Sequence, residues 1–513
     1  MNLYQFQQEA VDKFFKSGSL LVSITTGGGK TVVALEIIRR FLKKNSNFRC
    51  LIISPANLRQ NFVQNIEKFK LKINSCIVTD KSQFEDCYKT FNVLIVSYNF
   101  LRLYFQSVIF KFNWDLVICD ELHYAKNTAT VNYKTILQLR QRAKHFLGLT
   151  ASPLMNDPKE FFAIVSIVAN DLSILKEGLK LIKYKKIGET PLWKTILFGK
   201  KSKPQLIPVG VTDVEKFKQL LQKWVYIPEY TKLKGVTNRP EVKSYLVNVN
   251  LTKFEISAYK YALRSIPKHQ LKELQQGTIT DHELRAIRNS IIACQQTLLS
   301  PDYIYNYTTE ELSVNISRFR PGSKIIKAGE ILKVTGDKSI VYSPFLIFGA
   351  RLANQYFNTI GIKSAEYSGH VKQLERQKLV DQFEHGDLQV LCLTGAGQEG
   401  LNLPSCKNVL FLTLAWNQEV LRQVLGRALR ITSKNKFVNV IWLFATINGK
   451  ETIDHWMSRI IKRKALIRNV IFEILSEQNV SASLTGYEIP VGKPLRRLSW
   501  DKKDEKYILS KMP

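Results

Sequence analysis

Acidic residues are scarce in this chain relative to basic ones. The 513 residues contain 43 Asp and Glu against 75 Lys and Arg, which leaves a formal net charge of +32 at pH 7. Such an excess favours polyanionic partners, and nucleic acid is the leading candidate. A lysine-rich composition of the whole genome is the alternative explanation for the charge.

Paired cysteines and long apolar runs are also missing. The seven cysteines are odd in number and form no Cys-x-x-Cys pair, which argues for a reducing compartment and against a zinc site. No apolar run approaches the roughly 18 residues that span a bilayer, and residues 1–5 do not resemble a secretory leader. We therefore expect an intracellular, non-secreted protein with no membrane partner and no zinc.

The composition is typical of a globular protein, with 45% hydrophobic and 11% aromatic residues. The length allows about three domains. Apolar strands alternate with helical patterns from the amino terminus to about residue 165, and again from residue 324 onward. This alternation predicts an α/β fold with parallel sheets, whose strand ends carry the functional loops.

A glycine-rich stretch is the first candidate site. Residues 25–31 (Thr-Thr-Gly-Gly-Gly-Lys-Thr) lie between an apolar run that ends at Ile24 and a helical pattern that begins at Val32. Glycines let backbone N–H groups surround phosphate oxygens, and the helix adds its partial positive charge. Lys30 would reach the β- and γ-phosphates of ATP, and the Thr31 hydroxyl would bind Mg²⁺. A flexible surface loop is the alternative.

The expected nucleotide contacts also include a glutamine upstream. Gln7 can read the edge of an adenine because its amide both donates and accepts hydrogen bonds, although a plain surface helix is equally consistent with this position. The predicted ATP-binding residues are Gln7, Thr26, Gly27, Gly28, Gly29, Lys30 and Thr31.

A pair of carboxylates follows the apolar strand at residues 114–119. Asp120 can hold Mg²⁺ through water, and Glu121 can orient and deprotonate the attacking water. An acidic pair at a strand end is often only a helix cap, but the upstream glycine loop favours catalysis.

Two segments now resemble a known family, the Swi/Snf-type DNA translocases of helicase superfamily 2. Residues 120–127 (Asp-Glu-Leu-His-Tyr-Ala-Lys-Asn) are similar to its Asp-Glu-x-His-x-x-Lys-Asn motif, and residues 149–156 (Leu-Thr-Ala-Ser-Pro-Leu-Met-Asn) resemble its Leu-Thr-Gly-Thr-Pro-Leu-Gln-Asn motif. The resemblance implies two RecA-like lobes with a helical insertion between or on them.

The carboxyl-terminal half carries a further motif of this family. Residues 423–430 (Gln-Val-Leu-Gly-Arg-Ala-Leu-Arg) are similar to its Gln-x-x-Gly-Arg-x-x-Arg. On a helix, Gln423, Arg427 and Arg430 share one face. The resemblance implies that the two guanidinium groups stabilise charge on the transferring phosphoryl group, an effect worth roughly 10³ to 10⁵ in rate. A surface arginine helix is the alternative.

Candidate nucleic-acid contacts are polar residues next to predicted strands: Asn57, Ser97, Tyr98, Ser343 and Thr394. Several lysines between residues 176 and 203 could also line a nucleic-acid path, and a solvated helix face explains them equally well.

The resulting domain prediction has four parts. Residues 1–165 form the ATP-binding lobe, 166–320 a connecting region with the helical insertion, 321–470 the second lobe, and 471–513 a closing helix and basic tail. The function expected from the resemblance is an ATP- and Mg²⁺-dependent translocase on double-stranded or branched DNA. A strand-separating or branch-migrating helicase is the alternative enzyme, and an ATP-dependent clamp or recruitment subunit for a protein partner is the alternative from another class.

Overall fold

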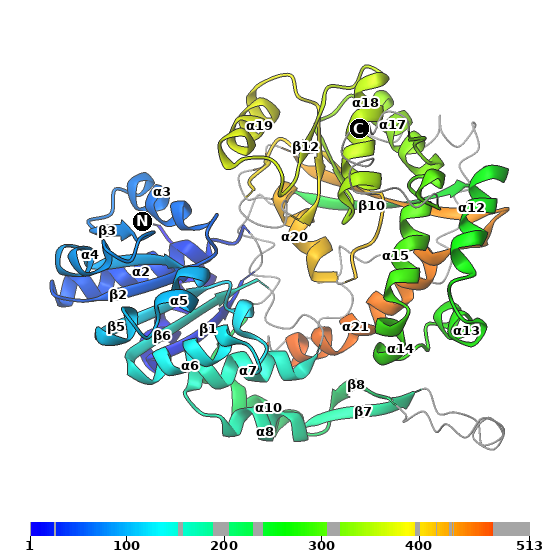
Figure 1. Ribbon diagram of the computed structural model, residues 1–513. Helices are drawn as coiled ribbons and strands as arrows, with labels where there is room; N and C mark the ends of the chain where they lie inside the picture. Colours follow the sequence, from blue (N-terminus) through cyan, green and yellow to red (C-terminus); the bar gives the residue numbers. More distant parts are fainter. Residues whose placement is uncertain are drawn as a thin grey trace. The chain divides into compact units, whose positions relative to one another are not determined.

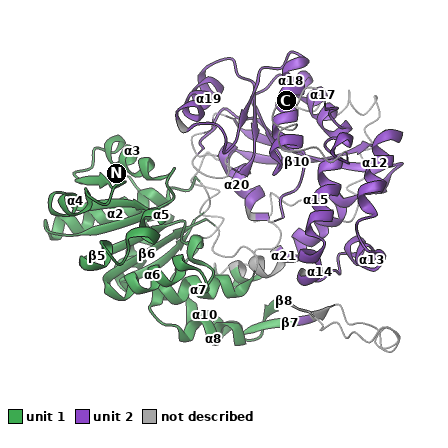
Figure 2. Cartoon of the chain, viewed as in Figure 1, with its two compact units in different colours: residues 1–184, 208–237, 465–481 green, residues 185–207, 238–464, 482–513 purple. Residues whose placement is uncertain are grey.

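The computed structural model describes residues 2–24, 27–151, 157–187, 205–228, 240–304, 319–395, 401–416, 418–429, 433 and 435–475 (Figure 1). The chain divides into two compact units (Figure 2). Unit 1 comprises residues 1–184, 208–237 and 465–481, and unit 2 comprises residues 185–207, 238–464 and 482–513.

Unit 1 is built on a seven-stranded sheet in the order β3-β4-β2-β5-β6-β1-β9, with parallel pairs throughout. Its strands are β1 (Ser19–Ser23), β2 (Cys50–Ser54), β3 (Ser75–Ile77), β4 (Val93–Ser97), β5 (Trp114–Asp120), β6 (Ala143–Thr150) and β9 (Val225–Tyr226). Its helices are α1 (Gln5–Ser17), α2 (Lys30–Lys44), α3 (Arg59–Lys68), α4 (Phe84–Thr90), α5 (Tyr98–Tyr104), η1 (Ile109–Lys111), η2 (Leu122–Ala125), α6 (Val131–Arg142), α7 (Pro158–Ala169), α8 (Ser173–Lys180) and α10 (Val214–Leu221).

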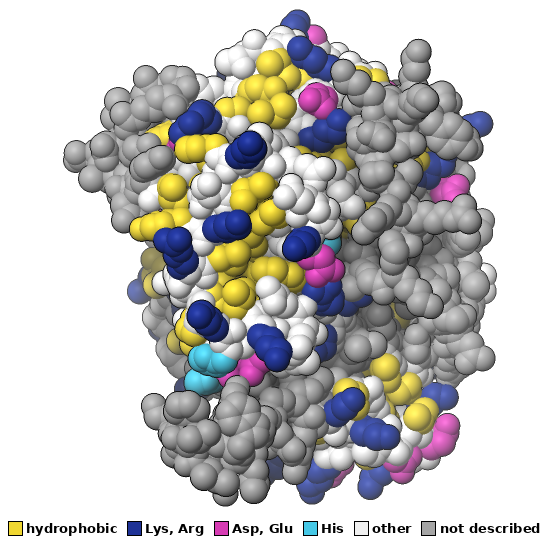
Figure 3. All heavy atoms as spheres, turned by 90° about the vertical axis from the view of Figure 1, so that its right-hand side faces the viewer, with side chains coloured by type: hydrophobic (Ala, Val, Ile, Leu, Met, Phe, Trp, Pro, Cys, Tyr) yellow, Lys and Arg dark blue, Asp and Glu magenta, His cyan; other side chains and the backbone are white. Residues whose placement is uncertain are grey.

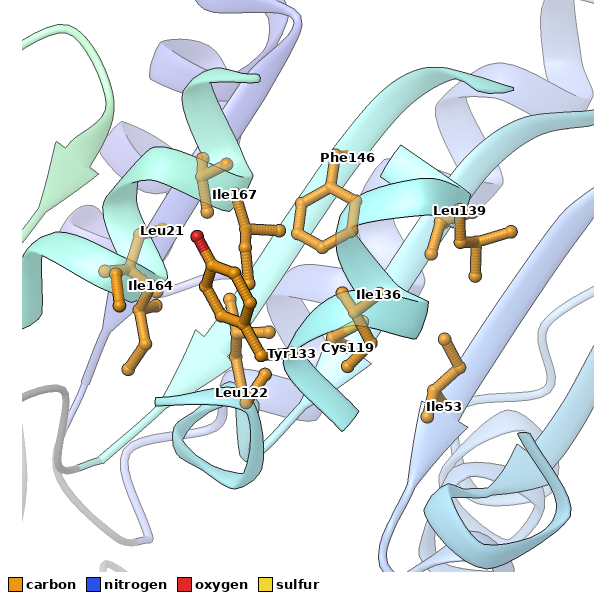
Figure 4. Packing of buried hydrophobic residues seen from close by; sticks show 14 of the residues in the cluster. Leu21, Ile53, Cys119, Leu122, Tyr133, Ile136, Leu139, Phe146, Ile164 and Ile167 are labelled. Atoms are coloured by element: carbon orange, nitrogen blue, oxygen red, sulfur yellow. The ribbon is translucent and has the colours of Figure 1, made fainter. Parts of the chain in front are cut away.

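Both faces of this sheet are buried, which explains why its strands are continuous apolar runs. In β2, Leu51 and Ile53 belong to the cluster formed with α5, α6 and α7, whereas Cys50 and Ile52 point into the opposite cluster with α1 and α2. Figure 4 shows the first cluster, in which Tyr133 of α6 lies near Ile167 of α7 and Ile136 of α6 lies near Cys119 of β5. The two layers of helices fix the strand ends, and therefore the loops that follow them.

Unit 2 has a second parallel sheet in the order β10-β15-β14-β11-β13-β12, with the short β16 antiparallel to β15. Its strands are β10 (Glu241–Asn250), β11 (Ser339–Tyr342), β12 (Ser364–Tyr367), β13 (Val390–Leu393), β14 (Asn408–Phe411), β15 (Phe437–Ile447) and β16 (Lys450–Glu451). Helices α17 (Ser323–Thr335), η5 (Leu346–Arg351) and α18 (Leu352–Thr359) contribute to one core cluster of this sheet, and α19 (Gln373–His385) and α20 (Gln418–Ala428) to the other.

A group of helices packs beside the second sheet around its own apolar core. Its members are α12 (Lys253–Leu263), α13 (Lys268–Gln276), α14 (Asp281–Ala286), α15 (Arg288–Thr297) and the start of α21 (Ile453–Leu475). The short helix η3 (Pro301–Ile304) follows α15 in the chain. The remaining strands, β7 (Ile182–Ile187) and β8 (Gln205–Val211), form a separate two-stranded sheet.

The predicted α/β class with two parallel sheets and added helices is confirmed. The four domain boundaries stay a prediction, and the contacts divide the chain differently in its middle. Residues 166–184 and 208–237 belong to unit 1, and β10 joins the second sheet. Within the described ranges, no helix is both long and apolar enough to cross a membrane, and no cluster of three potential metal-ligating His, Cys, Asp or Glu side chains occurs.

Candidate functional site

The glycine turn lies between β1 and α2, as predicted. Gly27 and Gly29 have φ angles of 80° and 83°, a left-handed region that favours glycine. At Gly29 a Cβ atom would lie 2.4 Å from Nε2 of Gln7, too close for any side chain without a shift. Helix α2 begins at the next residue, Lys30. Thr26, the other predicted residue of this turn, lies outside the described residues.

Gln7 holds the glycine turn against α1. Its Nε2 donates a hydrogen bond to the carbonyl of Gly28 at 3.0 Å, and its Oε1 accepts one from the backbone N–H of Tyr4 at 3.0 Å. The side chain is buried. The structure therefore brings this predicted adenine contact directly to the predicted phosphate loop.

Lys30 lies between the glycine turn and the acidic pair. Its Nζ is 3.4 Å from the carbonyl oxygen of Ile24 and 3.6 Å from Oε1 of Glu121. Both separations exceed the usual length of a strong N–H···O hydrogen bond, roughly 2.7 to 3.2 Å. The ammonium group is thus near the carboxylate of Glu121 but does not form a short hydrogen bond with it.

Asp120 is the last residue of β5, and neighbouring strands fix its position. Oγ of Ser54, at the end of β2, donates to Oδ2 of Asp120 at 3.1 Å, and the hydroxyl of Tyr98 donates to the Asp120 carbonyl at 2.7 Å. The backbone N–H of Glu121 donates to Oδ1 at 3.1 Å. Asp120 is therefore held at the carboxyl edge of the sheet by residues at or just after the ends of three adjacent strands.

Glu121 occupies an unusual backbone conformation. Its φ is 51°, which is rare for a residue with a side chain and is found often at functional sites. Oε2 lies 3.2 Å from Nδ1 of His123, and the same imidazole nitrogen is 3.3 Å from Oγ1 of Thr150. The left-handed turn and these partners orient the carboxylate of Glu121 toward Lys30.

The two carboxyl groups shift their pKa values in opposite directions. Burial raises the pKa of Asp120, and the neighbouring Glu121 raises it further. Burial also acts to raise the pKa of Glu121, but Lys30 and His123 outweigh it and lower that pKa below its usual value. Glu121 is therefore ionised at neutral pH, as a proton acceptor must be.

The residues present fit a nucleotide phosphate and a hard divalent cation. The turn has a glycine with a left-handed backbone at position 29, where a Cβ would meet Gln7, so its backbone N–H groups can approach phosphate oxygens closely. Lys30 supplies an ammonium group that lies 3.6 Å from its carboxylate neighbour. Thr31 lies in the first turn of α2, and Asp120 supplies a carboxylate, so both donors are oxygens, the ligands that Mg²⁺ prefers.

In unit 2, Gln423 and Arg427 lie one helical turn apart in α20, and both are buried. Nη1 of Arg427 donates to the carbonyl of Leu401 at 3.2 Å, and the carbonyl of Arg427 accepts from the N–H of Leu403. Arg430 lies outside the described residues. The helix predicted for this motif is present.

Most candidate nucleic-acid contacts are buried. Oγ of Ser97 accepts from the N–H of Phe100 and caps α5, and Oγ of Ser343 accepts from the N–H of Phe345. Tyr98 and Thr394 are buried as well, and Asn57 alone of the five is exposed, in the turn after β2. Their nucleic-acid role stays a prediction, but two of the hydroxyls also stabilise local turns.

Ser54 and His123 are site residues that sequence reasoning did not single out. For Ser54, its place at the end of the strand beside β5 was the available signal, because parallel strand ends meet at one edge. His123 stood inside the recognised motif, but no role was assigned to it.

Comparisons with known proteins place this arrangement in a family. The SNF2-related domain matches residues 16–303, and the helicase conserved C-terminal domain matches residues 323–432. The chain belongs to the SNF2-related family of superfamily 2 helicases, as predicted, and it is an ATP-hydrolysing enzyme.

Similar proteins include viral, bacterial and plant proteins. Nucleoside triphosphatase I of Choristoneura fumiferana entomopoxvirus is 24% identical over 89% of this chain and 75% of its own length. The uncharacterized ATP-dependent helicase YqhH of Bacillus subtilis is 24% identical over 91% of this chain and 78% of its own. Protein CHROMATIN REMODELING 19 of Arabidopsis thaliana is 22% identical over 87% and 65%.

Among solved structures, the chain is similar to the Sulfolobus solfataricus SWI2/SNF2 ATPase core in complex with dsDNA. The sequence identity is 16%, the TM-score is 0.40, and the match covers 96% of this chain and 98% of that one.

Proposed function

We propose that unit 1 binds and hydrolyses ATP at the glycine turn, and that the approach of Lys30 to Glu121 is the observation that carries this assignment. The backbone N–H groups of Gly27 to Gly29 and the Lys30 ammonium would bind the phosphates. Thr31 and Asp120 would hold Mg²⁺, which neutralises phosphate charge when bound. Gln7 would contact the adenine.

Glu121 is the proposed proton acceptor of the reaction. It is ionised, it is oriented by a left-handed turn, and His123 lies 3.2 Å from its second oxygen. A carboxylate in this state can orient a water molecule and take its proton as the water attacks the γ-phosphate. His123 would act as a positioning residue, since it contacts Glu121 and Thr150.

Gln423, Arg427 and Arg430 are proposed to stabilise charge on the transferring phosphoryl group. The support is their match to the family motif and the helical spacing that places Gln423 and Arg427 on one face of α20.

We further propose that hydrolysis drives movement along double-stranded DNA. Membership of the SNF2-related family supports a DNA-directed motor, and the relatives include a named chromatin remodelling protein. The net charge of +32 would supply a grip that does not depend on base sequence. Asn57, Ser97, Tyr98, Ser343 and Thr394 remain the candidate contacts.

The test is the rate of ATP hydrolysis by the purified chain alone and with single-stranded DNA, duplex DNA, a fork or RNA. The control is Lys30→Ala, which removes the phosphate-binding cation. We expect stimulation by duplex DNA that this variant abolishes. Stimulation confined to forks would favour a branch-migrating helicase.

Hydrolysis that depends on Lys30 but responds to no polymer would contradict the nucleic-acid-driven motor. That result would instead favour a recruitment subunit that acts through a protein partner.

A further inference from the structure

Helix α12 in unit 2 exposes two aromatic rings on its outer side. Phe254 is 41% exposed and Tyr261 is 60% exposed, although both are large apolar side chains. They are seven residues apart, which on an α-helix places them on one face with a rise of roughly 10 Å between them. The two rings are thus exposed along the same side of the helix.

Cations surround these rings. Lys253, Lys260 and Arg264 are all exposed on or next to α12. The guanidinium of Arg320 lies 4.2 Å from the centroid of the Phe254 ring, and its Nη2 forms an ion pair with Asp302. Arg320 therefore packs against the Phe254 ring while Asp302 balances its charge, so among the described residues the unpaired positive charge of this surface comes from the lysines and Arg264.

No exposed carboxylate on α12 balances this charge. The one acidic residue of the helix, Glu255, is buried and accepts hydrogen bonds from the N–H and hydroxyl of Ser323 and from the N–H of Thr252. Figure 3 shows the side of the molecule on which α12 lies in Figure 1, with hydrophobic side chains exposed between Lys and Arg side chains. The α12 face, defined as Lys253, Phe254, Lys260, Tyr261, Arg264 and Arg320, is thus both aromatic and basic.

We propose that the α12 face binds single-stranded nucleic acid. Two bases would stack on Phe254 and Tyr261, and the phosphates between and beside them would contact the cations. The combination favours a single strand over a duplex, because duplex bases are already stacked on each other and cannot reach a protein ring. None of these six residues is among the proposed duplex contacts, and binding at the α12 face is proposed to be independent of ATP hydrolysis.

The experiment measures binding of fluorescently labelled oligo(dT) to the full chain without nucleotide, by anisotropy. Stacking on one ring is commonly worth about 1–3 kcal/mol, so the double variant Phe254→Ala/Tyr261→Ala should bind the single strand at least tenfold more weakly. Tyr261→Ala alone, at the more exposed position, should give a smaller loss of roughly fivefold or more. Affinity for duplex DNA and the ATPase rate with duplex should not change.

A matched control uses exposed hydrophobic side chains elsewhere in unit 2. Val334 on α17 is 57% exposed and Leu374 on α19 is 76% exposed. The double variant Val334→Ala/Leu374→Ala therefore also removes exposed apolar surface, but from helices other than α12. This control should bind oligo(dT) as the wild type does. Ultraviolet crosslinking of oligo(dT) should label the peptide that contains Tyr261.

Three outcomes would overturn the inference. Unchanged oligo(dT) binding by a folded Tyr261→Ala variant would exclude stacking on this ring. An equal loss of duplex binding would make the α12 face part of the duplex path. Competition by an acidic peptide as strong as that by oligo(dT) would reassign the face to a protein partner. If the wild-type ATPase ignores duplex DNA while oligo(dT) binding still depends on the rings, only the proposed motor function fails.

Discussion

The buried ion pair between Lys324 and Asp454 allows a quantitative prediction. Lys324, in α17, is 0% exposed and Asp454, at the start of α21, is 1% exposed, with 2.7 Å between Nζ and Oδ2. The same oxygen accepts the backbone N–H of Ala445. Asp454→Ala would leave a buried ammonium without its counter-charge, and removal of one partner of such a pair costs about 3–5 kcal/mol.

The pH dependence of this variant has a defined sign. Burial already lowers the pKa of Lys324, and Asp454 opposes that shift. Without Asp454 the pKa of Lys324 in the folded state falls further below its unfolded value, so the unfolded chain binds this proton more tightly. Stability of the variant should then rise with pH, by up to about 1.4 kcal/mol per pH unit, until the pH reaches the unfolded value near roughly 10.4.

The assay is urea unfolding at several pH values, in which pulsed thiol labelling of Cys392 and Cys406 is the measure of unfolding. Both thiols are fully buried in unit 2, so their labelling reports the unfolding of the unit that contains the ion pair. The double variant Lys324→Met/Asp454→Ala should lose less stability than the two single variants together. A loss below about 1 kcal/mol in Asp454→Ala, or stability that falls as pH rises, would refute the reasoning.

Three further predictions concern the proposed function. Gly29→Ala, which combines a positive φ with a Cβ 2.4 Å from Gln7, should weaken binding of fluorescent ATP about tenfold, whereas Gly361→Ala, with a similar φ but open space around it, should leave it unchanged. Glu121→Gln should lower kcat by about 10² to 10⁴ with ATP affinity retained, as single-turnover kinetics and ATP binding would show; undiminished kcat would remove Glu121 from the chemistry. Raising the salt from about 50 to 200 mM should weaken duplex binding on the order of 10³-fold if about six phosphates are contacted, and a flat response in a titration would contradict the electrostatic grip.

The sequence was most informative where a strand end coincided with a polar motif. The predicted strand at residues 114–119 differs from β5 (Trp114–Asp120) by one residue at its end. It was predictable because four buried apolar residues in succession precede the carboxylates. The 3.6 Å approach of Lys30 to Glu121 agrees with the rule that parallel strands present their carboxyl ends at one edge.

The same rule was less informative for hydroxyl groups. Ser97 and Ser343 stand at strand ends and so were candidates for nucleic-acid contacts, but in the structure their oxygens accept backbone N–H groups in the turns that follow. A strand-end serine serves either purpose, and the sequence pattern around it is the same.

The middle of the chain was the least predictable part. Residues 208–228 join unit 1 in part through β9, a strand of only two residues that pairs with β1. So short a strand has no alternating pattern to detect, and its position depends on tertiary contacts. The ion pair between Lys324 and Asp454 likewise cannot be predicted from sequence pattern, since 130 residues separate its partners.

Movement along duplex DNA is the central claim, and displacement of a third strand from a DNA triplex tests it most directly. The wild-type chain with ATP should release the third strand and leave the underlying duplex intact, while Lys30→Ala should release none. Release without ATP, release by Lys30→Ala at the wild-type rate, or separation of the duplex itself would contradict the account.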